Sequence, residues 1–368
     1  MKVLITGSNG FIGSNLVSKL SEESQFEVIR FTRDSTKEDL RNSISKADFI
    51  FHAAGVNRPE NDIDFARVNT DLTKLICNEA IKTGRKIPIL FTSSVHVERG
   101  NTYGDSKLNA ENALLDYSSI SSAPVFIFRL PHVVGKWCRP NYNSVVSTFC
   151  HNIARNIPIV IDDPDYLLNV VYIDDLIDTA IQIALKKNIC GPFCEVSPNY
   201  SVSVGNLAKL FYDFKDSRNS LITEKVGNGL VRIMHATYMS YLPTSDFAYS
   251  LNKHEDERGN FVEFLKTQDS GQFSYFTAHP GITRGGHYHH TKTEKFLVVK
   301  GEAEFNFRNI LTNESCKIQT TSKDHQVIET IPGWAHDITN IGDSEMIVLL
   351  WANEIFDQKK PDTYNSPL

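Results

Sequence analysis

Three metal-binding side chains, His287, His289 and Glu294, lie within eight residues of the chain. On a β-strand, residues two apart point to the same face, so we expect His287 and His289 to aim at one point while His290 faces the other way. His336, in a later block, can supply a fourth ligand. Imidazole and carboxylate ligands suit zinc, iron or manganese better than copper(I), and no cysteine stands nearby to complete a closed thiolate site. The spacing therefore predicts a mononuclear metal site that keeps an open position.

The alternative interpretation is that these histidines are ordinary loop residues. Their clustering argues against it, because one short segment holds six of the twelve histidines: His279, His287, His289, His290, His325 and His336. Both a structural and a catalytic use of the metal stay open, since both occur at sites with such ligands.

A glycine-rich run follows the apolar stretch Lys2–Thr6 and precedes a helical pattern that starts at Ser14. Its glycines allow a tight turn and a close approach to a pyrophosphate, which then lies against the positive N-terminus of the helix. A plain glycine turn is the alternative, but the strand before the run and the helix after it favour dinucleotide binding. The predicted cofactor loop consists of Gly7, Asn9, Gly10, Phe11, Ile12 and Gly13.

The end of the second predicted strand indicates which dinucleotide binds. NAD enzymes place a carboxylate there for the ribose hydroxyls, whereas NADP enzymes place arginine for the 2′-phosphate. This chain has Arg30 and Arg33 there, so the sequence favours NADPH. Asp34 is the residue that argues for NAD, and either arginine can instead be a plain solvated charge.

Tyr103 and Lys107 are four residues apart at the start of a predicted helix, and Ser94 ends the strand before it. This spacing puts the tyrosine and the lysine on one helix face. A lysine ammonium nearby favours the phenolate, and a serine hydroxyl can hold the substrate oxygen, so the three residues are candidates for proton donation to a carbonyl. A tyrosine and a lysine at this spacing are also common on surface helices, where they have no such role.

Hydrophobic periodicity divides the chain into two predicted domains. The first half alternates β-branched runs with helical stretches, as in βαβ units of a parallel sheet. After about residue 243 the pattern changes to short strands separated by turns, which indicates an all-β barrel. Residues 1–243 are predicted to form the nucleotide-binding domain and residues 244–368 the metal-binding domain. Predicted strands are Lys2–Thr6, Glu27–Phe31, Phe49–His52, Pro88–Thr92, Val125–Arg129, Glu294–Val299, Ala303–Arg308 and Met346–Trp351.

The composition of this 368-residue chain limits the classes of partner that it can bind. Its net charge is −6 with acidic and basic residues intermixed, so we expect neither a nucleic acid nor a membrane surface as partner. The six cysteines show no zinc-ribbon spacing, and the spacing of Cys190 and Cys194 alone does not predict a disulfide. With no charged leader and no apolar stretch near ~20 residues, a reduced, cytoplasmic protein is expected.

Both halves resemble known families. The glycine run, Ser94, Tyr103 and Lys107 resemble an extended short-chain dehydrogenase/reductase with a Rossmann-type α/β fold. The spacing around His287 and His336 resembles the two motifs of the cupin superfamily, which implies a jelly-roll barrel. The reductase resemblance further implies a loop beside the cofactor diphosphate at Ala53, Ala54 and Gly55, an adenine contact at Asp48, a structural Asn69, and a segment beside the nicotinamide that includes Pro131.

Three further stretches, residues 54–59, 135–144 and 256–261, are similar to the bifunctional capsular-polysaccharide enzymes of the CapF family. That resemblance implies a homodimer with NADPH and zinc. It also implies conversion of a UDP-amino sugar, UDP-2-acetamido-2,6-dideoxy-4-hexulose, to UDP-2-acetamido-2,6-dideoxy-L-talose. His290, Lys295, Lys292 and Tyr288 all lie near the metal motif and remain open as the base that removes the C3 proton.

Two competing functions remain at this point. The chain can be a single-activity UDP-sugar 4-reductase or 4-epimerase whose cupin domain is structural. It can also be a regulator that senses NADPH, although the set Ser94, Tyr103 and Lys107 argues against this, because a sensor needs no proton donor.

Overall fold

The computed structural model describes residues 1–187 and 190–368, which form two compact units. The first unit contains Met1–Phe211 and Asn228–Pro243. The second contains Tyr212–Gly227 and Thr244–Leu368. The chain thus passes between the units three times, after residues 211, 227 and 243. Residues 212–227, which the hydrophobic pattern assigns to the first domain, belong to the second unit.

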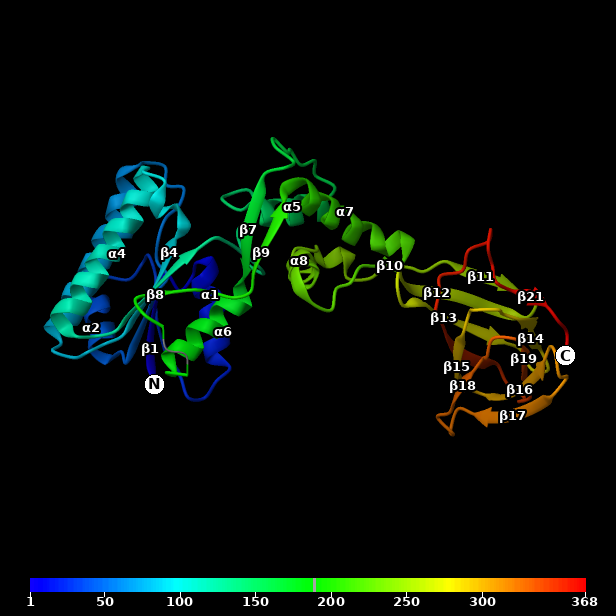
Figure 1. The fold of residues 1–368 in the computed structure, drawn as a ribbon. Coiled ribbons are helices and arrows are strands. Elements are labelled where there is room, and N and C mark those ends of the chain that lie inside the picture. Colours follow the sequence, from blue (N-terminus) through cyan, green and yellow to red (C-terminus); the bar gives the residue numbers. More distant parts are fainter. Residues whose placement is uncertain (188–189) are drawn as a thin grey trace. The chain divides into compact units, whose positions relative to one another are not determined.

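A parallel six-stranded sheet is the centre of the first unit (Figure 1). Its order is β2-β1-β3-β4-β5-β8, with bounds Glu27–Phe31, Lys2–Thr6, Phe49–His52, Ile89–Ser94, Val125–Leu130 and Phe193–Cys194. Every residue of β3 and β4 is buried. Parallel sheets have both faces covered, so their strands read as continuous apolar runs. For this reason the sequence predicts all of these strands except the short β8 to within two residues.

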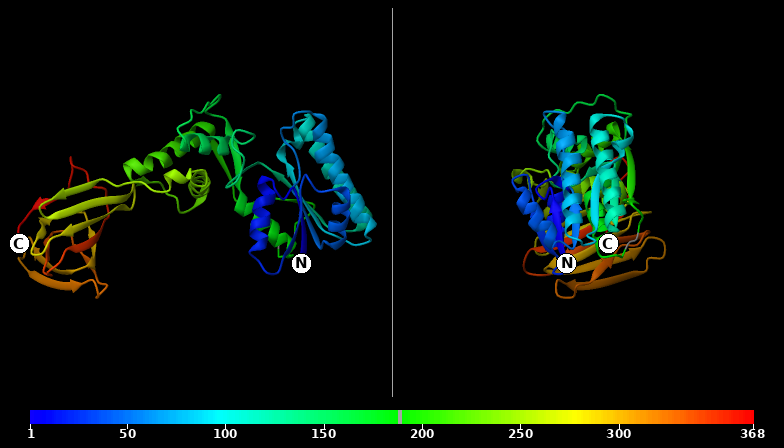
Figure 2. Two further views of the ribbon diagram at one scale, coloured as in Figure 1. Left: turned by 180° about the vertical axis from the view of Figure 1, so that it is seen from behind. Right: turned by 90° about the vertical axis from the view of Figure 1, so that its left-hand side faces the viewer.

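Helices cover both faces of this sheet. Helices α1 (Phe11–Ser21) and α6 (Ile173–Ala184) pack together on one face. Helices α2 (Lys37–Lys46), α3 (Leu72–Lys82) and α4 (Thr102–Ser121) form the other layer, seen face-on in the right-hand view of Figure 2. A π-helix (Phe65–Asp71) leads into α3, and a 3₁₀ turn (Val95–Glu98) follows β4.

The order of the strands in the sheet has a switch point at β1. From β1 the chain adds β2 on one side, and it then returns to add β3 on the other side of β1. In doubly wound sheets, ligands bind at such a switch point, outside the carboxyl ends of the strands. The predicted Rossmann-type fold of the N-terminal half is therefore confirmed, and the glycine run lies at the carboxyl end of β1 as that fold requires.

The remainder of the first unit has a small sheet, β6-β7-β9, with bounds His132–Val134, Leu167–Tyr172 and Asn199–Ser203. Helices α5 (Val145–Ala154) and α8 (Gly229–Met239) pack against each other, and α7 (Val204–Ser220) continues into the second unit. Cys190 and Cys194 form a disulfide, which corrects the expectation of reduced cysteines throughout. Among the described helices, none has both the length and the apolar composition needed to cross a bilayer.

Apart from the end of α7, the second unit is built of β-strands, as predicted for the C-terminal half. It consists of two sheets whose inner faces share one apolar core that includes Phe276, Phe296 and Phe305. One sheet has the order β10-β12-β13-β20-β15-β18, with β11 paired to β12; the bounds are Ile222–Thr223, Gly259–Thr267, Gly271–Ala278, Met346–Ala352, Glu294–Lys300, Val327–Glu329 and, for β11, Lys253–Asp256. The other has the order β17-β16-β19-β14-β21, with bounds Ser315–Thr321, Glu302–Asn309, Trp334–Asn340, Thr283–Tyr288 and Tyr364–Asn365. All these pairings are antiparallel except β10 with β12.

Candidate functional site

The glycine loop lies against the segment that follows β3. Gly7 has φ +66°, a conformation that side chains rarely adopt, and a Cβ added there would lie 2.7 Å from the Cα of Ala54. The N-cap of α1, Gly10, provides no side-chain hydrogen bond, and the first turn of α1 has no acidic residue. Neither the N-cap nor the first turn of α1 therefore supplies a carboxylate to the N–H groups of that turn, and these groups can receive an anionic group.

The other predicted cofactor residues fall at the same edge of the sheet, with one exception. Ala53, Ala54 and Gly55 follow β3, Pro131 follows β5, and Arg30 at the end of β2 donates to Asn9 of the glycine loop at 2.8 Å. Arg33 lies exposed just beyond β2.

Asp48 is the exception, because it precedes β3 and lies at the amino edge of the sheet. Its carboxylate accepts the Lys2 backbone N–H at 2.9 Å and pairs with Arg85 at 2.9 Å. The expected adenine contact is therefore wrong: Asp48 ties β1 to β3 at the end of the sheet opposite the glycine loop.

Ser94, Tyr103 and Lys107 are brought together by the end of β4 and the start of α4. Asn101 caps α4 by accepting the Gly104 N–H at 2.8 Å, which fixes where the helix begins. Burial raises the pKa of Tyr103, and the Ser94 hydroxyl beside it partly offsets this rise. The phenol is therefore a weak acid that needs a nearby cation to lose its proton at neutral pH.

Lys107 is the available cation and is buried. Its ammonium donates to the Thr92 carbonyl at 2.9 Å and lies 4.7 Å from the centre of the Phe91 ring. Burial lowers the pKa of Lys107 to about 8, and the carboxylate of Glu111 opposes that effect. Both protonation states are accordingly populated near neutral to mildly alkaline pH.

Glu111 belongs to this site although it is part of none of the predicted motifs. It is 1% exposed, pairs with Arg129 at 2.8 Å and accepts the Ser93 hydroxyl at 2.5 Å. It follows Lys107 by four residues and thus shares its helix face, and the sequence shows this spacing. Its partner on β5 depends on the sheet order, which local spacing does not reveal.

Asn69 joins the loop after β3 to α4. Its amide accepts from the Val56 N–H at 2.9 Å and donates to the Val56 carbonyl at 3.0 Å and the Ser106 hydroxyl at 3.0 Å. The loop containing Gly55 is thereby held against Lys107: a Cβ added at Gly55 would lie 3.1 Å from the lysine nitrogen.

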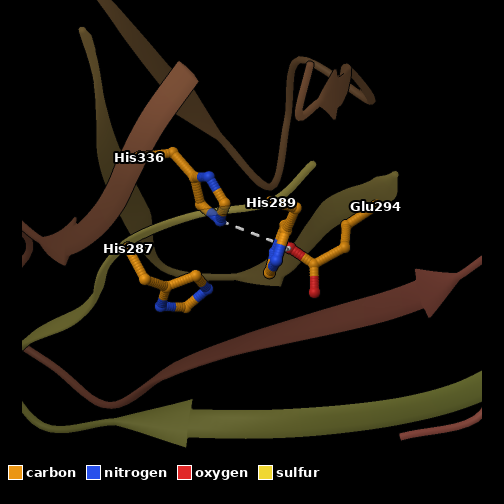
Figure 3. A group of neighbouring side chains, drawn as sticks. All are labelled: His287, His289, Glu294 and His336. Atoms are coloured by element: carbon orange, nitrogen blue, oxygen red, sulfur yellow. Dashed lines mark hydrogen bonds and ion pairs between the residues drawn. The ribbon is translucent and has the colours of Figure 1, made fainter. Parts of the chain in front are cut away.

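In the second unit, His287, His289, Glu294 and His336 converge on one point (Figure 3). One ligand atom from each lies within 4.8 Å of the others. His287 on β14 pairs directly with His336 on β19, while Glu294 opens β15 in the facing sheet. His290 lies against Tyr364, with ring centres 4.8 Å apart, and is not among the four that converge.

Gly285 allows β14 to approach β19 closely enough for this pairing. Its φ is +104°, and a Cβ added there would lie 2.8 Å from the His336 carbonyl oxygen. The register shifts between Gly285 and His287, so a bulge turns the strand just before the first histidine of the cluster.

Hydrogen bonds select which nitrogen each histidine presents. His289 Nδ1 lies 2.5 Å from the Asp362 carbonyl oxygen, and His336 Nδ1 lies 3.4 Å from the Trp334 carbonyl oxygen. A carbonyl only accepts, so in both rings Nδ1 carries the hydrogen and Nε2 is the free ligand atom. The two Nε2 atoms lie 3.2 and 3.3 Å from Glu294 Oε2. Burial, reinforced by the neighbouring imidazoles, lowers the pKa of His287 to about 4, so the His287 ring is neutral at neutral pH.

The structure places two of the four residues predicted as candidate bases near the metal motif, Lys295 and Lys292. Lys295 follows the buried Glu294 on β15, so its side chain points to the opposite, exposed face, where it pairs with Glu329. Lys292 is 6% exposed and donates to the Pro361 carbonyl at 3.2 Å and to Thr363 at 3.1 Å. Lys295 is therefore excluded as a base at this cluster, and Lys292 is held under the C-terminal residues.

Comparison with known proteins accounts for both units. Residues 3–191 match the NAD dependent epimerase/dehydratase family, and residues 254–364 match the polysaccharide biosynthesis C-terminal domain. A UDP-2-acetamido-2,6-beta-L-arabino-hexul-4-ose reductase from Pseudomonas aeruginosa is 53% identical over 364 residues, which is 99% of this chain and 98% of that protein. A crystal structure of the capsular polysaccharide assembling protein CapF from Staphylococcus aureus matches with a TM-score of 0.93 and 38% identity, covering all of both chains.

The chain belongs to the CapF family. A second crystal structure of CapF, with the inhibitor 3-isopropenyl-tropolone, matches all of the chain with a TM-score of 0.88 and 36% identity. Membership of the CapF family, with its epimerase/dehydratase half, makes this protein an oxidoreductase that uses a nicotinamide cofactor.

Proposed function

We propose that this chain is a bifunctional nucleotide-sugar enzyme. Its second unit, a cupin barrel, inverts C3 of a UDP-2-acetamido-2,6-dideoxy-4-hexulose, and its first unit then reduces the C4 ketone with NADPH. The product is UDP-2-acetamido-2,6-dideoxy-L-talose, the precursor of UDP-N-acetyl-L-fucosamine for capsule or O-antigen. The observation that carries this proposal is the 53% identity to the Pseudomonas reductase over nearly the full length of both proteins, because it spans both units.

NADPH fits the residues at the carboxyl edge of the parallel sheet. The uncapped first turn of α1 suits the pyrophosphate, and the exposed guanidinium groups of Arg30 and Arg33 suit the 2′-phosphate. When bound, NADPH supplies the hydride for the ketone carbon. The protein supplies the proton that the new alcohol requires.

Tyr103 is the proposed donor of that proton to the C4 oxygen. Ser94 holds the same oxygen with its hydroxyl, which keeps the ketone in place for proton transfer. Protonated Lys107 stabilises the phenolate that Tyr103 leaves behind, since an adjacent cation favours the charged form. Glu111, one helix turn from Lys107, helps keep the lysine protonated.

Zinc fits the second cluster. Three imidazoles that can be neutral and one carboxylate form a common zinc donor set, and their ligand atoms lie within 4.8 Å of one another. Among the described residues, buried His336 Nε2 has no hydrogen-bond partner, and Glu294 Oε2 lies 3.3 Å from it. A cation between the two atoms would satisfy both. Bound by His287, His289, Glu294 and His336, zinc would act as a Lewis acid toward an oxygen of the substrate.

The order of the two reactions follows from the substrate. A C4 ketone makes the C3 proton acidic, because its removal leaves the electron pair delocalised onto the C4 oxygen. Return of a proton to the opposite face inverts C3 with no net change in composition. Once C4 is an alcohol the C3 proton is no longer acidic, so epimerisation precedes reduction.

Hydrogen exchange at C3 tests whether the two activities are separate. The 4-keto sugar is incubated in deuterated water without NADPH, and deuterium at C3 is followed by NMR. Tyr103→Phe should retain exchange while its later reduction with NADPH slows by about 10²–10⁴-fold, the usual contribution of a positioned acid. His287→Ala should lose exchange.

Two results would contradict the proposal. Equal loss of exchange in both variants would disprove separate sites. A wild-type enzyme that reduces the ketone but never exchanges C3 would support a single-activity reductase with a structural second unit instead.

A further inference from the structure

The last residues of the chain lie along the metal cluster. Residues 361–366 form what we call the C-terminal strap. Its strand β21 pairs with β14, placing Asn365 opposite His287 and Tyr364 opposite Tyr288. The Ser366 N–H also donates to the Gly286 carbonyl at 2.8 Å. The strap therefore extends the sheet on the edge that contains the first histidine of the cluster.

Asp362 connects the strap to the loop between His289 and Glu294. Its carboxylate accepts the backbone N–H groups of His290 at 3.0 Å, Thr291 at 2.9 Å and Lys292 at 2.9 Å. It also accepts the Thr291 hydroxyl at 2.9 Å. One side chain thus satisfies three consecutive backbone donors, which sets the path of the loop between two of the cluster residues.

The backbone of the same residue contacts the cluster directly. The Asp362 carbonyl accepts from His289 Nδ1, so it fixes both the tautomer and the ring orientation of His289. The free Nε2 then lies 3.2 Å from Glu294 Oε2, at the point where the ligand atoms converge.

Lys292 fastens the strap on both sides of Asp362. Its buried ammonium donates to the Pro361 carbonyl and to the Thr363 hydroxyl, and no carboxylate pairs with it among the described residues. The Lys292 ammonium therefore binds the residues on both sides of Asp362. These two hydrogen bonds limit how far the Asp362 carbonyl can move.

We propose that Asp362 is a positioning residue for the metal, which orients His289 through its carbonyl and orders residues 290–292 through its carboxylate. This inference rests on the proposed zinc site. Groups that orient metal ligands from outside typically change metal affinity by about 10–100-fold when mutated. A purely structural strap would instead affect only the unfolding of the unit.

The experiment compares zinc affinity in the full-length protein. Asp362→Asn keeps the size of the side chain but replaces one carboxylate oxygen, an acceptor, with an NH₂ group. This donor would face the backbone N–H groups of residues 290–292, which are donors too. Thr291→Val removes only one of the four hydrogen bonds. Asp357→Asn is the matched control, because Asp357 lies in the same C-terminal region. Its carboxylate accepts the Lys359 backbone N–H at 2.8 Å and not the N–H groups of residues 290–292. Zinc dissociation constants are measured by competition with a chromophoric chelator, and the visible spectrum of the cobalt(II) form reports ligand geometry.

We expect Asp362→Asn to weaken zinc binding by about 10–100-fold and to alter the cobalt spectrum. Thr291→Val should weaken it by about fivefold, the effect of losing a hydrogen bond of about 1 kcal/mol. Asp357→Asn should match the wild type. If Asp362→Asn does not fold, the result for Thr291→Val decides.

Unchanged affinity and spectrum in both variants, with only a lower melting temperature, would overturn the inference. That outcome differs from failure of the zinc site itself. If the wild type binds no zinc, or if His287→Ala binds it equally well, the metal proposal fails before the role of Asp362 is tested.

Discussion

The two candidate sites balance charge in opposite ways. In the first unit the buried cation Lys107 has the carboxylate of Glu111 a helix turn away, and it contacts the Thr92 carbonyl and the Phe91 ring. In the second, one buried carboxylate, Glu294, lies among three imidazoles. The first arrangement leaves a group near its titration point, which suits proton transfer. The second gathers three imidazoles and one carboxylate around a point, which suits a bound cation.

The largest effect should come from removing a group at the second site. His336→Ala should weaken zinc binding by more than about 100-fold, because losing a ligand costs more than losing an outer partner of one. The measurement is zinc affinity by chelator competition. His325→Ala is the control, since His325 is an exposed histidine of the same unit outside the cluster. If His336→Ala and His325→Ala bound zinc with equal affinity, the second site would not be a metal site and would not differ from the first in this way.

Sequence spacing predicts part of this second site, because His287, His289 and Glu294 lie close together in the chain, whereas His336 comes from the distant strand β19. His287 lies near the end of β14 and His289 directly follows that strand, and their ring centres lie 4.9 Å apart, as the alternation of side chains predicts. The parallel strands of the first unit are equally readable, because burial on both faces produces uninterrupted apolar runs such as Phe49–His52.

What the sequence cannot predict depends on which strand lies beside which. Asp48 has the right residue type for a ribose or adenine contact, but its position before β3 puts it at the wrong edge of the sheet. Glu111 and Arg129 are 18 residues apart and meet only because β5 lies beside β4. Asp362 is 73 residues from His289, so no local pattern links the two.

A smaller effect is expected at the cofactor end of the first site. Arg33→Ser should raise the KM for NADPH by about tenfold and leave that for NADH nearly unchanged, because a charged hydrogen bond to the 2′-phosphate contributes roughly 1.5 kcal/mol. Steady-state kinetics with both cofactors measures the difference. Arg85→Ser is the control, since Arg85 pairs with Asp48 at the opposite edge of the sheet. An equal rise for NADH would assign Arg33 no part in cofactor choice.

The smallest effect is a shift in pH dependence that separates the two sites. Lys107 is cationic below its pKa of about 8 and neutral above it, so kcat/KM for reduction should fall as pH rises through that value. Glu111→Gln removes the carboxylate that raises this pKa, so the fall should begin at lower pH. The C3 exchange rate of the same variant should keep its own pH profile.

The control for that shift is Asp116→Asn, an exposed acid on the same helix. Profiles of Glu111→Gln and wild type that superimpose would show that Lys107 does not govern the alkaline limit.

The two-residue strand β10 determines where the chain can be divided into fragments that fold separately. Ile222 and Thr223 pair with Lys266 and Thr267, although α8 and the end of the first unit come between them in the chain. A fragment cut at residue 244 would expose that edge of β12 to pairing with other polypeptides, a common start of aggregation. An autonomous version of the β-sheet unit must therefore carry residues 212–227 along, as a leader or as a rearranged insert.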